Sequence, residues 1–204
     1  MIRKLFFVLT GYLNGSMLYG EYITKLIKGK DIMKESKDGN PGTANAFMVG
    51  GFLSGFLTLI CDLLKGFLPV YAFHNLFPDS YLLPVVMMAP VLGHAFSIFH
   101  GFHGGKAIAV SFGVLLGLYP QMKAVLILVC YYLLFSVIRI SPHWKRSIIT
   151  YLCFGITAFC LVEERTIVLG CIGIALTVIG KHIPSVKCDS WERLKIKKEI
   201  DMEK

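Results

Sequence analysis

Four groups of polar residues interrupt an otherwise apolar chain, and the first of them suits an anion. It runs from Lys37 to Asn45 and reads Lys-Asp-Gly-Asn-Pro-Gly-Thr-Ala-Asn, just before a long apolar stretch. Glycine and proline favour a tight turn, and the start of the following helix offers unpaired N–H groups at the positive end of its dipole, where anions bind. The plainer alternative is an ordinary turn with Thr43 or Asn45 as the helix cap. The groups that could contact an anion are Gly39, Asn40, Gly42 and Asn45.

A second segment, between Gly93 and Lys106, is rich in glycine and histidine. Its Gly104-Gly105-Lys106 turn precedes an apolar stretch and offers N–H groups and an ammonium to a phosphate, although the full P-loop pattern is absent. Three histidines in this segment could bind a metal ion together: His94, His100 and His103. No cysteine or carboxylate accompanies them in this stretch, so phosphate is the better hypothesis and we expect no metal. The plainer interpretation places the histidines at the membrane interface.

Two charged residues, Asp62 and Lys65, lie inside an apolar segment at a spacing that puts both on one face of a helix. A charge inside a membrane is costly unless it is paired, so we expect the two to form an ion pair. That pair either fixes helix packing or takes part in binding, and the sequence leaves both open. Gly66 follows, and a glycine there would let a neighbouring helix approach closely.

The remaining polar segments, Arg139–His143 and Lys181–Ser185, each follow an apolar stretch. Ser141, Lys181 and His182 could bring a hydroxyl, a cation and a base to an anionic substrate. Both segments could equally be basic anchors at the cytoplasmic face of a membrane.

The elements that must position these groups are membrane helices. Of the 204 residues, 55% are hydrophobic and only 17% are charged, with a mean hydropathy of +0.64. A spanning helix needs roughly 20 mostly apolar residues, because its backbone must satisfy its own hydrogen bonds in lipid. We therefore expect an all-α polytopic bundle, in which the fourth stretch is short and could form a hairpin or a re-entrant pair with the fifth. The roughly seven candidates are Leu5–Thr24, Ala46–Phe73, Tyr81–Phe99, Ala107–Leu118, Gln121–Ile138, Ser147–Val162 and Thr166–Gly180.

The basic residues indicate an orientation. With the N-terminus outside and the C-terminus in the cytoplasm, most of the 21 Lys and Arg residues fall in cytoplasmic loops and the C-terminal tail. The net charge of +8 is then mainly a topology signal, and nucleic acid is not needed to explain it. We expect one transmembrane domain over residues 1–186 and a basic cytoplasmic tail over residues 187–204, which is either an amphipathic helix on the membrane or a solvated end.

In this order and at these separations, the segments resemble motifs of the bacterial membrane-integral acyl-phosphate:glycerol-3-phosphate acyltransferase family. The family's loop Gly-Ser-Gly-Asn-x-Gly-Ala-Thr-Asn corresponds to Lys37–Asn45, and its Asp-x-x-Lys-Gly corresponds to Asp62–Gly66. Its Gly-His-x-(Phe/Tyr)-Pro and Phe-Lys-Gly-Gly-Lys-Gly motifs correspond to Gly93–Ser97 and Phe102–Ala107. The resemblance covers most of the chain, from the first apolar stretch to the region of His182.

The resemblance implies a multi-pass enzyme of the bacterial cell membrane that acts in phospholipid synthesis. It would transfer a fatty acyl group from acyl phosphate to glycerol 3-phosphate or a related polyol phosphate, with no cofactor, and membrane lipid would be its other partner. Positioning and neutralisation of charge on oxygen would supply the catalysis. The implied catalytic residues are Lys106, His94, Asn40, Ser141 and His182, and the implied substrate-binding residues are Gly39, Gly42, Asn45, His103, Gly104, Gly105 and Lys181.

Several positions depart from the family's motifs. Asp38 stands where the family has serine and is expected to repel an anion, apolar Phe47-Met48 replace an arginine, and His103 replaces the first lysine of the glycine turn. Losing several charge-assisted contacts to phosphate lowers affinity by orders of magnitude. The alternative function is therefore a paralogue that no longer transfers acyl groups and serves as a lipid-binding or membrane-assembly protein. A transporter or channel is less attractive, because the charges gather at one face. The sequence leaves the oligomeric state open.

Overall fold

The structure is a computed structural model that describes the backbone of residues 1–202 and the side chains of residues 1–183. Every regular element in this described part is helical, so the predicted all-α class is confirmed. The predicted boundary between a domain at residues 1–186 and a tail at residues 187–204 lies outside the described side chains. The elements are α1 (Ile2–Gly15), α2 (Tyr19–Lys28), α3 (Ile32–Glu35), α4 (Thr43–Leu76), α5 (Leu83–Ala95), η1 (Ile98–His100), α6 (Ile108–Leu116), α7 (Lys123–Val137), α8 (His143–Leu161) and α9 (Arg165–Met202).

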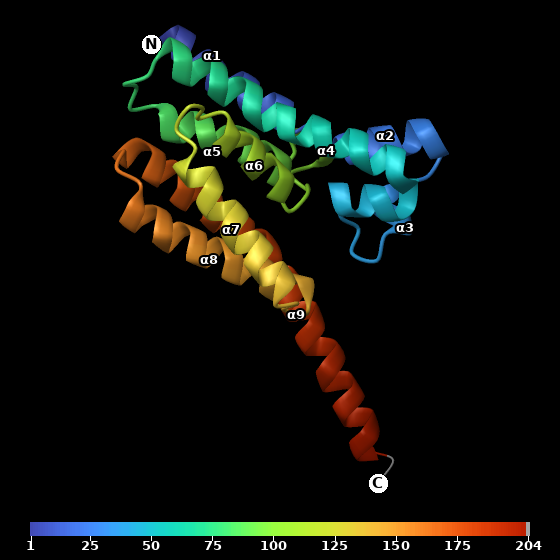
Figure 1. Ribbon diagram of the computed structural model, residues 1–204. Coiled ribbons are helices and arrows are strands. Elements are labelled where there is room, and N and C mark those ends of the chain that lie inside the picture. The colour runs from blue at the N-terminus through green and yellow to red at the C-terminus, as the bar shows by residue number, and fades with distance from the viewer. Residues whose placement is uncertain (203–204) are drawn as a thin grey trace.

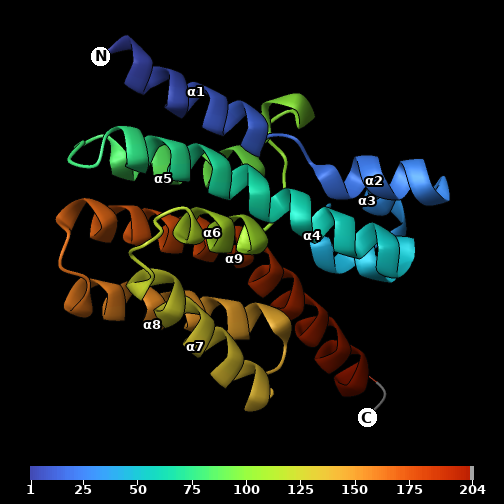
Figure 2. The same cartoon turned by 45° about the horizontal axis from the view of Figure 1, so that its top comes forward.

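The helices form layers, as Figure 2 shows. Helix α1 packs against α4 and α5, α5 packs against α6 and α9, and α8 packs against α7 and α9. Helices α2 and α3 lie at one end of the molecule beside the N-terminal part of α4 (Figure 1). The loop that follows α3 and the loop that follows η1 meet, because Lys106 pairs with Asp38.

Three helical stretches in the described residues are long and apolar enough to cross a membrane: Thr43–Leu76, Leu83–His100 and Arg165–Ile183. Helix α7 is a shorter apolar helix. Helix α6 has nine residues, and at a rise of 1.5 Å per residue it extends for about 14 Å, less than half of a hydrocarbon core of roughly 30 Å. The helix alone therefore covers only part of that core.

The predicted first span, Leu5–Thr24, is wrong as a single helix, because the chain breaks between α1 and α2. At the break, the carbonyl of Ser16 accepts a hydrogen bond from the hydroxyl of Ser97 at 2.6 Å. The next carbonyl, of Met17, accepts one from the ammonium of Lys65 at 2.7 Å. Backbone that leaves a helix at membrane depth is tolerated where protein groups satisfy it in this way.

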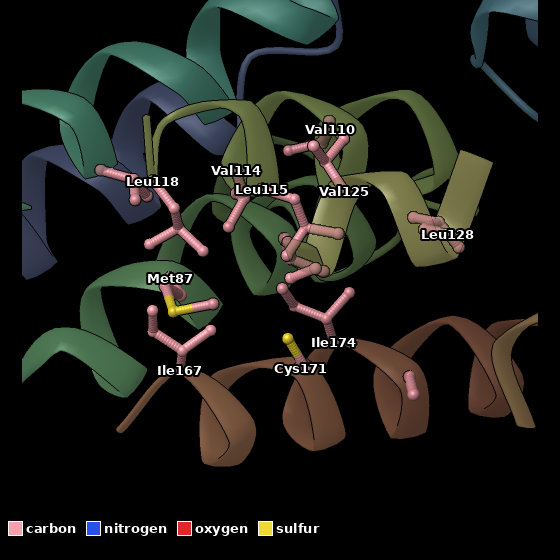
Figure 3. Packing of buried hydrophobic residues seen from close by; sticks show 14 of the residues in the cluster. Met87, Val110, Val114, Leu115, Leu118, Val125, Leu128, Ile167, Cys171 and Ile174 are labelled. Atoms are coloured by element: carbon pink, nitrogen blue, oxygen red, sulfur yellow. The ribbon is translucent and has the colours of Figure 1, made fainter. Parts of the chain in front are cut away.

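The apolar core lies where α5, α6 and α9 meet, and α7 and α8 close it. This core includes Met87, Leu118, Ile167 and Cys171, all of them almost fully buried (Figure 3). The outer faces are apolar as well, with Phe52, Val137 and Phe159 exposed by 76%, 79% and 69%. Apolar side chains on so many outer faces indicate lipid as the surrounding solvent.

The crossing of α4 and α6 is very close, because each helix presents a glycine to the other. A Cβ atom on Gly66 would overlap the carbonyl of Val110, and one on Gly113 would overlap the carbonyl of Leu63. The expected role of Gly66 in close packing is confirmed. This contact holds the start of α6, and with it Lys106, near the charged residues of α4.

Candidate active site

The buried ammonium of Lys65 is the centre of a polar cluster inside the bundle. It lies 2.8 Å from Asp62 Oδ1 and 2.8 Å from His94 Nδ1, and it donates to the carbonyl of Met17 at 2.7 Å. The ammonium has three hydrogens, of which His94 and Met17 take two, and the contact with Asp62 is an ion pair. The hydroxyl of Thr43 donates to the other oxygen of Asp62 at 3.2 Å. Lys65 is therefore held by protein groups, and one of them is the ring of His94.

The glycine turn before α6 folds directly onto His94. The N–H of Gly105 donates to the carbonyl of His94 at 2.9 Å. A Cβ atom on Gly105 would overlap Nε2 of the His94 ring, and one on Gly104 would overlap the His94 carbonyl. Only glycine fits at these two positions. Lys106 is the next residue after the turn, and its side chain is one-fifth exposed.

Asp38 joins this turn to the loop before α4. Its Oδ2 lies 2.8 Å from the ammonium of Lys106. Its Oδ1 accepts hydrogen bonds from the side-chain amide of Asn45 at 2.7 Å and from the backbone N–H of Asn40 at 3.3 Å. The amide of Asn45 also donates to the carbonyl of Asn40 at 2.7 Å. Two polar segments that are far apart in the sequence therefore meet at one carboxylate.

The carboxylate of Asp38 is ionised at neutral pH. Its partial burial would by itself raise the pKa, but hydrogen bonds from Lys106 and Asn45 outweigh burial and hold the pKa of Asp38 below its usual range. The site thus contains a cation and an anion that neutralise each other.

His182 and Lys181 approach the site from α9. His182 is buried, its Nδ1 donates to the carbonyl of Val178 at 2.8 Å, and its ring stacks on His143 with centroids 6.3 Å apart. Among the described residues, Nε2 of His182 has no hydrogen-bond partner. The ammonium of Lys181 donates to the carbonyl of Ala95 at 2.9 Å, so it stabilises the end of α5. Because Nδ1 donates, Nε2 of the neutral ring is an acceptor, and His182 is the member of this pair with a free polar atom for a ligand.

A sequence profile described as glycerol-3-phosphate acyltransferase matches residues 5–188. The chain belongs to the glycerol-3-phosphate acyltransferase family. It is 32% identical over 178 residues to the glycerol-3-phosphate acyltransferase of Idiomarina loihiensis, covering 87% of this chain and 88% of the relative. It is 31% identical over 190 residues to that of Endomicrobium trichonymphae, covering 92% of each chain. The predicted family is thereby confirmed.

Solved structures of the family have the same fold. The glycerol 3-phosphate form of PlsY (YgiH), an integral membrane glycerol 3-phosphate acyltransferase, matches with a TM-score of 0.81 and 30% identity over 94% of each chain. The lysophosphatidic acid form of PlsY matches with a TM-score of 0.79 and 28% identity, over 94% of this chain and 93% of that one. The protein is therefore a multi-pass integral membrane member of the acyltransferase family.

Within this acyltransferase fold, the structure brings together many of the predicted site residues. Asn40 and Asn45 meet Lys106 through Asp38, and His94 contacts the glycine turn. Gly39 adopts a left-handed φ of 60°, and the missing side chain of Gly42 leaves room for the amide of Asn40. These residues form one connected cluster.

Two of the predicted site residues make no hydrogen bond to this cluster in the described part of the chain. The exposed ring of His103 is within 2.9 Å of the carbonyl of Gly101 in its own turn. Ser141 is exposed, and its hydroxyl has no hydrogen bond to the described residues. Sequence reasoning missed the carbonyl of Met17 and treated Thr43 only as a helix cap. Every residue has a backbone carbonyl, so the residue type does not reveal which carbonyl accepts a hydrogen bond from a distant side chain.

Proposed function

We propose that this protein transfers a fatty acyl group from acyl phosphate to the 1-hydroxyl of glycerol 3-phosphate, as a step of phospholipid synthesis. One observation supports this most. Lys106 follows a glycine turn that folds over His94, and its ammonium contacts Asp38 in the loop that also carries Asn40 and Asn45. Ammonium, amide and backbone N–H donors are the groups that hold phosphate. Family membership supplies the rest, since both PlsY forms are named for a phosphorylated ligand.

The chemistry needs positioning and charge neutralisation. The hydroxyl oxygen of the acceptor attacks the acyl carbon, the bond from that carbon to the phosphate oxygen breaks, and inorganic phosphate leaves with the electron pair and takes up the hydroxyl proton. Lys106 and the backbone N–H of Gly104 would stabilise the negative charge on oxygen, since the N–H of Gly105 is used by the carbonyl of His94. His94 would orient a phosphate through Nε2, because Nδ1 is held by Lys65. His182 would accept a hydrogen bond from a hydroxyl of glycerol 3-phosphate through Nε2, because its Nδ1 donates to the carbonyl of Val178.

The test is acyl transfer by the purified protein in detergent, with acyl phosphate and glycerol 3-phosphate. We expect Lys106→Ala to lower kcat/KM by roughly a hundredfold, the effect of removing one donor to a developing oxyanion. Lys123→Ala is the matched control, because Lys123 is also a lysine paired at 2.8 Å with a carboxylate, that of Glu163, outside the proposed site. Equal activity in wild type and Lys106→Ala would remove Lys106 from the mechanism.

We expect about seven membrane crossings, with the N-terminus outside and the C-terminus in the cytoplasm, as the distribution of basic residues indicates. Residues 1–186 would form one domain before the tail. Labelling of single added cysteines with a membrane-impermeant maleimide tests it. We expect label on Lys4→Cys in intact cells and on Lys34→Cys only after permeabilisation, each compared with the unsubstituted protein. The opposite pattern would reverse the orientation and place the site outside.

A second candidate function, a paralogue that binds lipid without acyl transfer, is favoured by one contact. Lys106 is already paired with Asp38, which leaves less positive charge for a substrate. In the same assay, wild-type protein that releases no phosphate from acyl phosphate with any polyol phosphate acceptor would select this candidate over the enzyme.

A further inference from the structure

The carboxylate of Asp38 occupies donors that a phosphate would use. Its two oxygens together take the ammonium of Lys106 at 2.8 Å, the amide of Asn45 at 2.7 Å and the backbone N–H of Asn40 at 3.3 Å. A positive ammonium, a carboxamide and a main-chain N–H are a typical set of phosphate ligands. The site therefore holds an anion of its own.

Charge makes this contact a competition. An arriving phosphate is negative, as Asp38 is, and two anions that share one ammonium repel each other. For Lys106 to contact a phosphate fully, the carboxylate of Asp38 must either turn away or share the ammonium at a cost in affinity. Its side chain is 43% exposed, so solvent gives it room to turn.

We propose that Asp38 sets the affinity of this site for the phosphate group of its substrate, by competing with that phosphate for Lys106. The inference rests on the proposed function, because it takes the ligand to be a phosphorylated substrate. Removing the charge of Asp38 then frees Lys106 and strengthens phosphate binding. This distinguishes the proposal from a purely structural role, in which Asp38 holds the loop through Asn45 and its removal weakens binding.

Two variants separate these roles. Asp38→Asn keeps a side-chain oxygen that can accept from Asn45 and from the N–H of Asn40, but it loses the charge that holds Lys106. Asp38→Ser removes the charge and shortens the side chain. Calorimetric titration of the purified protein in detergent with glycerol 3-phosphate measures Kd, and a parallel titration with a non-reactive acyl phosphonate measures binding at the donor's phosphate position.

We expect the Kd of at least one of these two ligands to fall about tenfold in Asp38→Asn or Asp38→Ser, the gain of roughly one charge-assisted contact. The ligand that gains affinity identifies the phosphate that Lys106 contacts. In Lys106→Ala/Asp38→Asn the gain should disappear, because it depends on the freed ammonium. Glu163→Gln is the matched control: it breaks a carboxylate–lysine pair of the same length, 2.8 Å, away from the site, and should leave both Kd values unchanged.

Unchanged or weaker binding of both ligands in both Asp38 variants, at wild-type unfolding temperature, would overturn the proposal, as would a gain that survives Lys106→Ala. The titrations do not depend on turnover. Absence of acyl transfer together with the expected gain in binding would refute the proposed enzyme and retain the role of Asp38. Acyl transfer without the gain in binding would retain the proposed enzyme and refute the role of Asp38.

Discussion

The ammonium of Lys65 lies 2.8 Å from Nδ1 of His94, and this contact determines which side of the ring is left for a ligand. An ammonium can only donate, so Nδ1 accepts and the neutral ring carries its hydrogen on Nε2. Nε2 is the atom that lies against Gly105. A buried residue of α4 thereby orients a hydrogen-bond donor toward the glycine turn.

The first prediction concerns this tautomer. In protein labelled with ¹⁵N at histidine, we expect His94 to show an unprotonated Nδ1 and a protonated Nε2 throughout the neutral range. The signal is assigned by its loss in His94→Asn. A protonated Nδ1 would mean that Lys65 does not donate to the ring, and the orientation argued above would be wrong.

The second prediction concerns the Asp62–Lys65 pair, whose side chains are 2% and 1% exposed. Lys65→Met leaves the charge of Asp62 buried without a partner, which we expect to lower the free energy of unfolding by about 3–5 kcal/mol. Adding Asp62→Leu removes the lone charge and should restore much of the loss. Thermal unfolding in detergent measures both. Equal unfolding temperatures for the single and double variants would show that the pair is not energetically coupled.

The third prediction concerns the fit of the glycine turn. Gly105→Ala places a Cβ atom against the ring of His94, so we expect the turn to shift and kcat/KM to fall about tenfold or more, since small misplacements at a site have such effects. Gly180→Ala is the control, because a Cβ atom there meets nothing within 4 Å in the described residues. Wild-type activity in Gly105→Ala would show that the turn tolerates a side chain.

The fourth prediction is a pH dependence. The folded pKa of Asp38 is held below its usual range, so its contribution to stability is fully present above the ordinary carboxyl pKa of about 3.9 and is lost as the pH falls through the lower folded value. The difference in unfolding temperature between wild type and Asp38→Asn should be constant from pH 8 to about pH 5 and should shrink in stronger acid. A difference that changes near pH 7 would assign the effect to another group.

Hydropathy and charge placed the apolar helices and the polar turns, because membrane helices and basic loops are local properties of the chain. The break between α1 and α2 was not predictable in this way. Its carbonyls are satisfied by Ser97 and Lys65, which lie 81 and 48 residues further along the chain. A residue pattern cannot show a partner so distant.

Asp38 is the clearest limit of sequence reasoning at the site. Its type showed that a negative charge stood in an anion-binding loop, and repulsion of a ligand was the natural expectation. The structure adds the partner: the carboxylate reaches Lys106, in a turn 68 residues away. The distinction between a charge that repels and one that competes depends on that contact.

A structure of the protein with glycerol 3-phosphate bound tests the central claim most directly. We predict that the phosphate lies within hydrogen-bonding distance of the ammonium of Lys106, beside the glycine turn, with the carboxylate of Asp38 turned away from its present 2.8 Å contact. A phosphate bound elsewhere, with the Asp38–Lys106 pair intact, would contradict it.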